Sequence, residues 1–103
     1  MADINFDPNG PGIDNGRYFG LPFTAEESRL VLFPVAWDVT TSYREGTAEG
    51  PTAIQRASLQ VDLYDPHHPQ GWQQGIGTLP SDKSIHENSK KLRKTAQRVI
   101  EHW

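Results

Sequence analysis

The sequence has 103 residues, of which 35% are hydrophobic, and its formal net charge is -3. A chain this short holds one small core, because short chains bury a smaller share of their surface on folding. The acidic balance argues against a nucleic-acid partner, and no apolar run approaches the ~20 residues that cross a bilayer. With no cysteine and no signal-peptide pattern, we expect a cytoplasmic protein with no membrane partner.

Residues 1–28 are rich in Gly, Pro, Asn and Asp, which predicts an extended N-terminal arm laid over some other surface. A disordered arm is the alternative. Thr24 and Glu27 match a capping box, so a single helical turn is expected over residues 25–28. The isolated apolar anchors of the arm are Phe6, Tyr18, Phe19, Leu21 and Phe23.

Two strands and a helix are predicted in the middle of the chain. Residues 30–35 form a nearly continuous apolar run, which is typical of a strand covered on both faces in a parallel sheet. Gly50-Pro51 opens a helix that ends near Leu59, with Ala53, Ile54 and Ala57 on its inward face. Residues 60–65 alternate as a short strand, and the stretch 67–80 is predicted to be a loop pinned by Trp72.

A last helix, capped by Ser81 or Asp82, is predicted to be amphipathic. Its apolar stripe consists of Ile85, Leu92, Ala96, Val99, Ile100 and Trp103. Its remaining faces carry Lys90, Lys91, Arg93, Lys94 and Arg98, which we interpret as a solvated face, with an anionic partner as the alternative. The chain reaches Trp103 without a glycine cap or a proline stop, so we expect a longer parent protein.

The polar run 38–47 is the first candidate for function, because it follows a strand end, where open α/β sheets bind their ligands. Its hydroxyls can bind a small polar ligand or can bond their own backbone. Asp38 begins the run, and a lone carboxylate there more often bonds loop amides than transfers protons. The second candidate is a metal site at Asp65, His67 and His68, for which an ordinary surface turn is the preferred interpretation.

The segment WDVTTSYREGTAEGPTAIQRASLQVDLYD resembles the N-terminal region of the ureohydrolases, the arginase/agmatinase/formimidoylglutamase family. The preceding arm, FDPNGPGIDNGRYFGLPFTAEE, resembles the agmatinase-like branch that includes guanidine hydrolases. In the family this loop lines the entrance to the substrate pocket. The positions that match the family pattern are Trp37, Asp38, Thr40, Thr41, Ser42, Tyr43, Gly46, Thr47, Gly50 and Pro51. Ala36 and the Arg44-Glu45-Gly46 run depart slightly from it.

The resemblance implies a partial three-layer α/β/α unit with a short parallel sheet, an extended N-terminal arm and a C-terminal amphipathic helix. The arm is expected over 1–28 and an incomplete arginase-like domain over 29–103. Family members form trimers or hexamers and hydrolyse guanidino or formimino groups with a pair of Mn ions, or with Ni in the guanidine-cleaving branch.

The metal ligands of the family lie in later motifs of the GGDH, DAHxD and DxDxxDP kinds, and none of these occurs in this sequence. We therefore expect an N-terminal ureohydrolase fragment that is inactive by itself and has no catalytic or metal residues of its own. Its partner would be the remainder of the domain or a homo-oligomer. The alternative is a stand-alone interaction module that binds a full-length relative through the stripe Leu92, Val99 and Trp103.

Overall fold

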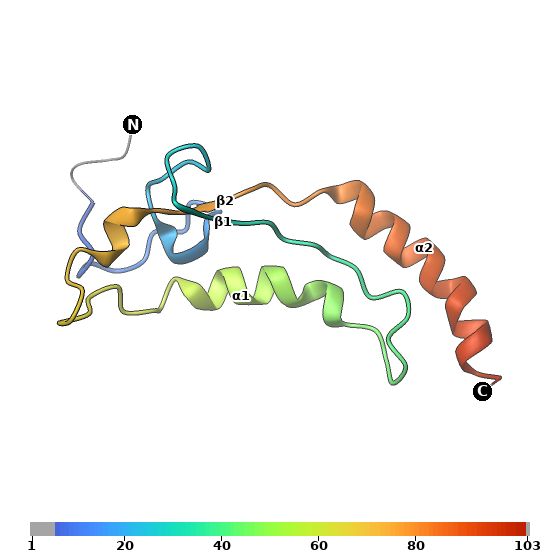
Figure 1. Ribbon diagram of the computed structural model, residues 1–103. Coiled ribbons are helices and arrows are strands. Elements are labelled where there is room, and N and C mark those ends of the chain that lie inside the picture. Colours follow the sequence, from blue (N-terminus) through green and yellow to red (C-terminus); the bar gives the residue numbers. More distant parts are fainter. Residues whose placement is uncertain (1–5, 103) are drawn as a thin grey trace. The chain divides into compact units, whose positions relative to one another are not determined.

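A computed structural model describes residues 6–102 of the chain, so Trp103 lies outside the described residues. The chain divides into two compact units: the residues up to Phe33 with Ala53–Leu79, and Pro34–Thr52 with the residues from Pro80 onward. The elements, with η for a 3-10 helix, are η1 (Tyr18–Gly20), β1 (Leu30–Leu32), η2 (Thr47–Glu49), α1 (Gly50–Ser58), η3 (Gly71–Gln74), β2 (Ile76–Thr78) and α2 (Lys83–Ile100) (Figure 1).

A parallel sheet and two α-helices in the described part confirm the predicted α/β class. None of the helices within residues 6–102 is long and apolar enough to span a membrane. The predicted boundary between an arm over 1–28 and a domain over 29–103 stays a prediction.

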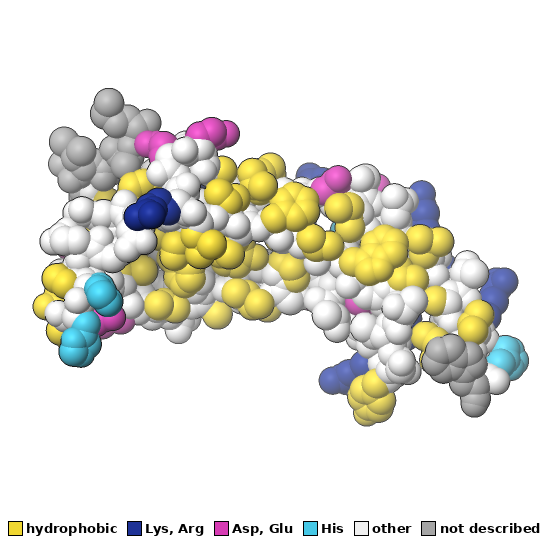
Figure 2. All heavy atoms as spheres, in the orientation of Figure 1, with side chains coloured by type: hydrophobic (Ala, Val, Ile, Leu, Met, Phe, Trp, Pro, Cys, Tyr) yellow, Lys and Arg dark blue, Asp and Glu magenta, His cyan; other side chains and the backbone are white. Residues whose placement is uncertain are grey.

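The first unit contains the sheet, in which β1 and β2 run in parallel with Leu30 opposite Ile76. β1 confirms the predicted strand but ends at Leu32, and Pro34 has no N–H with which to extend the ladder. The expectation that both faces are covered is wrong for the described residues, since Leu30 is 55% and Val31 40% exposed. In Figure 2, many hydrophobic side chains (yellow) are visible on the surface that faces the viewer.

β2 lies where the sequence predicts a loop, and the strand predicted over 60–65 does not form. Asp62 accepts a hydrogen bond from the Tyr64 N–H at 3.0 Å, and Asp65 accepts one from the His67 N–H at 2.8 Å. Both aspartates turn the backbone locally instead of leaving it to a neighbouring strand. A Cβ at Gly77 in β2 would lie 2.7 Å from the Cα of Ala25. β2 can therefore approach the turn over residues 25–28 only with a glycine at position 77.

Three of the five apolar side chains named in the arm are buried. Leu21 is fully buried, and Tyr18 and Phe23 are nearly so. The Trp72 ring centroid lies 5.1 Å from that of Phe6 and 6.2 Å from that of Phe23, so Trp72 pins its loop to the arm.

The capping box of the arm is also confirmed. The Thr24 N–H donates to Glu27 Oε1 at 3.1 Å, and the Glu27 N–H donates to Thr24 Oγ1 at 3.3 Å. This reciprocal pair closes the single helical turn expected over residues 25–28.

α1 forms as predicted, but its predicted inward face is wrong. Ala53, Ile54 and Ala57 are exposed, while Ser58 is buried. The Ser58 Oγ accepts a hydrogen bond from the Phe19 N–H at 2.8 Å. The helix therefore holds the arm through a polar contact, which apolar periodicity does not reveal.

α2 is capped by Asp82, whose Oδ1 accepts from the Ser84 N–H at 2.9 Å. Its buried residues are Ser89 and Arg93, whereas Leu92 and Val99 of the predicted stripe are 47% and 54% exposed. Four of the five basic residues interpreted as a solvated face are exposed, as predicted, namely Lys90, Lys91, Lys94 and Arg98.

Candidate functional site

Asp38 closes the base of the polar loop in the second unit. Its Oδ2 accepts hydrogen bonds from the N–H of Gly46 at 2.8 Å and of Ala48 at 3.2 Å. Its Oδ1 accepts one from Ser89 Oγ at 3.1 Å, and the same hydroxyl accepts from the Asp38 N–H at 3.1 Å. The two ends of the loop are thereby tied together and fixed to α2.

These contacts hold the pKa of Asp38 below its ordinary value of 3.8. The main cause is the hydrogen bond from Gly46; burial acts in the opposite direction, and Ala48, Ser89 and the charge of Arg93 add to the lowering. The two N–H groups that the carboxylate binds lie at the start of η2, where backbone N–H groups favour a negative charge. Asp38 is thus an ionised anchor whose oxygens are already engaged, as the preferred interpretation of the sequence has it.

Gly46 has a backbone conformation that requires glycine. Its φ is 136° and its ψ is -23°, a backbone conformation that residues other than glycine rarely adopt. A Cβ there would meet no atom within 4 Å. The requirement therefore comes from the turn itself and not from crowding.

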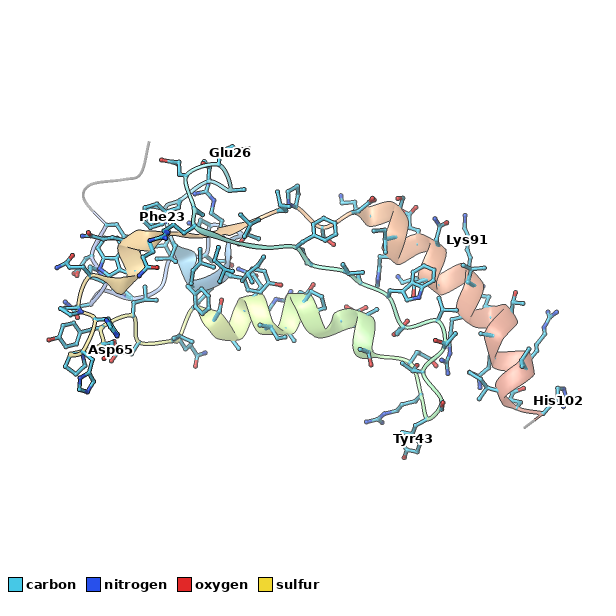
Figure 3. The ribbon with its side chains drawn as sticks, in the orientation of Figure 1. Phe23, Glu26, Tyr43, Asp65, Lys91 and His102 are labelled. Carbon is cyan, nitrogen blue, oxygen red and sulfur yellow. The ribbon has the colours of Figure 1, made fainter. Side chains whose placement is uncertain are left out.

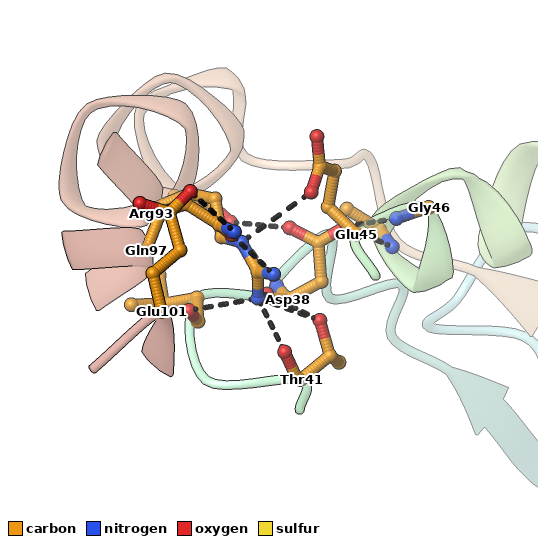
Figure 4. Close-up of polar contacts among 10 residues, drawn as sticks. Asp38, Thr41, Glu45, Gly46, Arg93, Gln97 and Glu101 are labelled. Atoms are coloured by element: carbon orange, nitrogen blue, oxygen red, sulfur yellow. Dashed lines mark hydrogen bonds and ion pairs between the residues drawn. The ribbon is translucent and has the colours of Figure 1, made fainter. Parts of the chain in front are cut away.

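Arg93 of α2 holds the other side of the loop (Figure 4). Its Nη1 donates to the carbonyl of Thr41 at 2.6 Å, to Thr41 Oγ1 at 2.9 Å and to the carbonyl of Val39 at 3.3 Å. Its Nη2 donates to Gln97 Oε1 at 2.8 Å, and its Nε lies 3.4 Å from Glu45 Oε2. Arg93 is 7% exposed, so its interpretation as a solvated charge is wrong.

The remaining polar side chains of the loop face solvent. Thr40, Ser42 and Thr47 are exposed, and Tyr43, which is 91% exposed, projects from the loop (Figure 3). The guanidinium carbon of Arg44 lies 5.7 Å from the centroid of the Tyr43 ring, a cation–π distance. Residues 41–47 line an open hollow.

The other predicted positions flank this loop. Trp37 precedes it and is partly exposed, while Gly50 and Pro51 form the half-buried first turn of α1. The structure thus places Asp38 and Thr41 in contact with α2 and leaves most of the other matched side chains exposed to solvent. Such a loop can offer hydroxyl donors and acceptors to a polar ligand.

Ser89 and Arg93 were missed by the sequence reasoning, although a signal for them exists. They are four residues apart, and Arg93 follows Ile85 by eight residues and precedes Ile100 by seven. These spacings place both on the same helix face as the apolar residues. A charged residue within an apolar stripe indicates a buried ionic contact. A helical period that is counted on apolar residues alone does not detect such a residue.

Two comparisons with known proteins agree. A sequence model described as the Arginase family matches residues 28–102. The chain belongs to the arginase family. An N(1)-aminopropylagmatine ureohydrolase from Synechocystis sp. is 41% identical over 39 residues, and one from Thermococcus kodakarensis is 44% identical over 39 residues. An agmatinase from Bacillus cereus is 38% identical over 42 residues. No solved structure matches the chain significantly.

The match to these arginase-family relatives is partial. It covers 38% of this chain and 13% of the Synechocystis protein, 38% and 14% for the Thermococcus protein, and 41% and 14% for the Bacillus protein. The matched segment therefore spans about a seventh of the length of these curated relatives. Its short parallel sheet and two α-helices are consistent with part of the α/β fold of the family.

The paired metal ions of the arginase family do not fit the residues described. Within residues 6–102, no three His, Cys, Asp or Glu side chains are grouped so as to hold a metal ion. His67 and His68 lie exposed on a turn, where Asp65 is already bonded to the backbone of His67. His86 Nε2 lies 3.6 Å from Glu49 Oε1, a pair without a third ligand.

Proposed function

We propose that this chain is the N-terminal part of a ureohydrolase-type enzyme that hydrolyses a guanidino C–N bond, as an agmatinase or a guanidine hydrolase does. Its supporting observation is the arginase-family match over residues 28–102, which includes the whole loop 38–51. The names of the curated relatives, aminopropylagmatine ureohydrolase and agmatinase, favour a guanidino substrate that carries an amine.

In this proposal the loop from Trp37 to Pro51 forms one wall of the substrate pocket. Asp38 and Arg93 hold its backbone, while Ser42, Tyr43 and Thr47 present hydroxyls to the substrate. The metal ligands, for Mn or Ni, come from the remainder of the enzyme, so that residues 1–103 alone are inactive. A cytoplasmic location and assembly into an oligomer, both expected from the sequence analysis, belong to the same proposal.

The test is to read the coding DNA beyond codon 103 and to express the whole frame. We expect later motifs that hold a metal pair, and urea release from agmatine or guanidine that is lost on chelation and restored by Mn²⁺ or Ni²⁺. Arginine serves as the comparison substrate. Residues 1–103 alone should release no urea and should contain no stoichiometric metal.

Substitutions in the whole enzyme test the pocket wall. Tyr43→Ala should raise KM several-fold, whereas the matched control Lys91→Ala, at an exposed position on α2, should leave KM unchanged. Hydrolysis by residues 1–103 alone, or a continuing frame without metal motifs, would contradict the proposal.

The second candidate function is an interaction module that binds a full-length ureohydrolase. The exposure of Leu92 and Val99 on α2 favours it. Light scattering after size exclusion should then show a mixed complex that Leu92→Glu abolishes and Lys94→Glu does not. A monomer with no affinity for a ureohydrolase rejects this function.

A further inference from the structure

We propose that Arg93 is a positioning residue, which holds the loop 38–47 in a single shape from its place on α2. The effect on a substrate rests on the proposed function, whereas the effect on the loop does not. Both the loop and α2 belong to the second unit.

The charge of Arg93 is buried. A buried cation is costly unless acceptors surround it. Here the acceptors are mainly backbone carbonyls of the loop, at Val39 and Thr41, and they lie 3.3 Å and 2.6 Å from Nη1. A planar guanidinium directs its donors in fixed directions, so these contacts form together in only one conformation of the loop.

α2 holds the loop at two points that lie one helical turn apart. Ser89 bonds the carboxylate and the N–H of Asp38, and Arg93 bonds Thr41. Asp38 in turn binds the N–H groups of Gly46 and Ala48. Arg93 Nη1 also donates to the carbonyl of Asp38 at 3.4 Å. The shape is therefore transmitted from Arg93 through Asp38 to the N–H groups of Gly46 and Ala48 at the far end of the loop.

The forked guanidinium of Arg93 is also held by a residue of its own helix. Nη2 bonds Gln97 at 2.8 Å, and Gln97 Nε2 bonds Glu101 at 3.2 Å. A lysine has one ammonium group and cannot reproduce both directions of the fork. Arg93→Lys should therefore keep the charge and lose part of the positioning, which separates the geometry of Arg93 from its charge.

The experiment measures amide hydrogen exchange in the 103-residue chain for Arg93→Met and Arg93→Lys. We expect the Gly46 and Ala48 amides to exchange about tenfold faster in Arg93→Met, and less so in Arg93→Lys, while amides in the middle of α1 keep their protection. The matched controls are Lys94→Met and Arg98→Met, exposed positions on the same helix. These two variants should match the parent chain at every amide.

Two outcomes overturn the inference: unchanged exchange at Gly46 and Ala48 in Arg93→Met, or an equal rise at all amides, which is the mark of general destabilisation. Should Arg93→Met not fold, Gln97→Leu removes one brace and must accelerate the same amides to a smaller extent. Exchange that stays unchanged in Gln97→Leu and Arg93→Lys rejects the inference as well.

The link to catalysis is tested in the whole enzyme, where Arg93→Lys should raise KM and change kcat less. A parent enzyme without ureohydrolase activity counts against the proposed function, and the exchange data still decide the role of Arg93. A normal KM in Arg93→Lys with a loosened loop would reject the link between the loop shape and the substrate.

Discussion

Asp38 takes the place of the N-cap side chain that the helix starting at Thr47 lacks. The residue at the cap position is Gly46, which has no side chain, and the N–H groups of Gly46 and Ala48 bond Asp38 instead. A residue eight positions earlier in the chain thus both caps a helix and closes a loop. A helix cap of this kind is not visible in a local sequence pattern, because capping rules compare residues within one turn.

The first prediction concerns Asp38→Asn. The hydrogen bonds that the Asp38 carboxylate accepts are charge-assisted. The substitution should therefore lower the free energy of unfolding by about 1–2 kcal/mol near neutral pH. Because the pKa of Asp38 is lowered in the folded state, its contribution is present above the ordinary value of 3.8 and is lost as the pH falls through the lowered pKa. Urea titrations followed by circular dichroism should show the two chains converging in acid.

The control for this prediction is Glu26→Gln, at an exposed carboxylate in the arm. It should leave stability unchanged at every pH. A constant difference between Asp38→Asn and the parent chain, from neutral pH down to well below pH 3.8, would show that Asp38 does not act through its charge.

The second prediction compares two glycines. Gly46→Ala forces alanine to a φ of 136° and should cost about 1–3 kcal/mol through backbone strain. Gly50→Ala, at a helical φ of -56° and with open space at its Cβ, should stabilise the chain by about 0.5–1 kcal/mol. Opposite shifts of the urea midpoint are expected, and shifts of the same sign would contradict this account.

At the scale of elements, the third prediction concerns the contact of α1 with the arm. Ser58→Ala leaves the Phe19 N–H without its 2.8 Å acceptor, at a residue with a φ of 63°, and should cost about 1–3 kcal/mol. Limited proteolysis should then cut the arm near Phe19 sooner. Ala57→Ser, on an exposed position of the same helix, is the control and should leave the cleavage rate unchanged.

The sequence predicts those elements whose signals are local. α2 has an aspartate N-cap and a helical spacing of apolar residues that is sustained over its length. The turn at Thr24 has its capping box, and α1 begins at a Gly-Pro pair. β2 has no local signal, since it comprises three residues with a central glycine and pairs with β1 far away in the chain. Residues 60–65 carry a strand pattern but pair with no strand among residues 6–102, and their aspartates turn the chain instead.

The candidate site is predictable in part. The loop follows from its composition and its family pattern, and the anchoring role of Asp38 follows from its place at the loop's start. The partners Ser89 and Arg93 lie about fifty positions later, and their contacts depend on how α2 meets the loop. Such a long-range polar contact is fixed by tertiary structure and not by any spacing within the loop itself.

At the scale of the whole molecule, the chain leaves a large amount of apolar surface uncovered. The exposed apolar side chains of β1 and of the segment after it include Leu30, Val31, Phe33 and Val35, and Ile54 on α1 is also exposed. A two-stranded sheet is marginally stable without further strands or a covering layer. We therefore expect the 103-residue chain to bind an apolar dye in its folded state and to self-associate as its concentration rises.

The last prediction uses Ile54, the exposed apolar residue of α1. In the 103-residue chain Ile54→Lys should change the free energy of unfolding by less than about 0.5 kcal/mol, as at other exposed positions. In the whole enzyme of the proposed function we expect the remainder of the domain to cover this face, so the same lysine should destabilise the protein by several kcal/mol by burying a charge. Leu21→Ala, which opens a cavity at a fully buried residue, should destabilise both proteins by about 2–5 kcal/mol. An Ile54→Lys variant tolerated equally in both would mean that the apolar face of α1 stays uncovered in the enzyme.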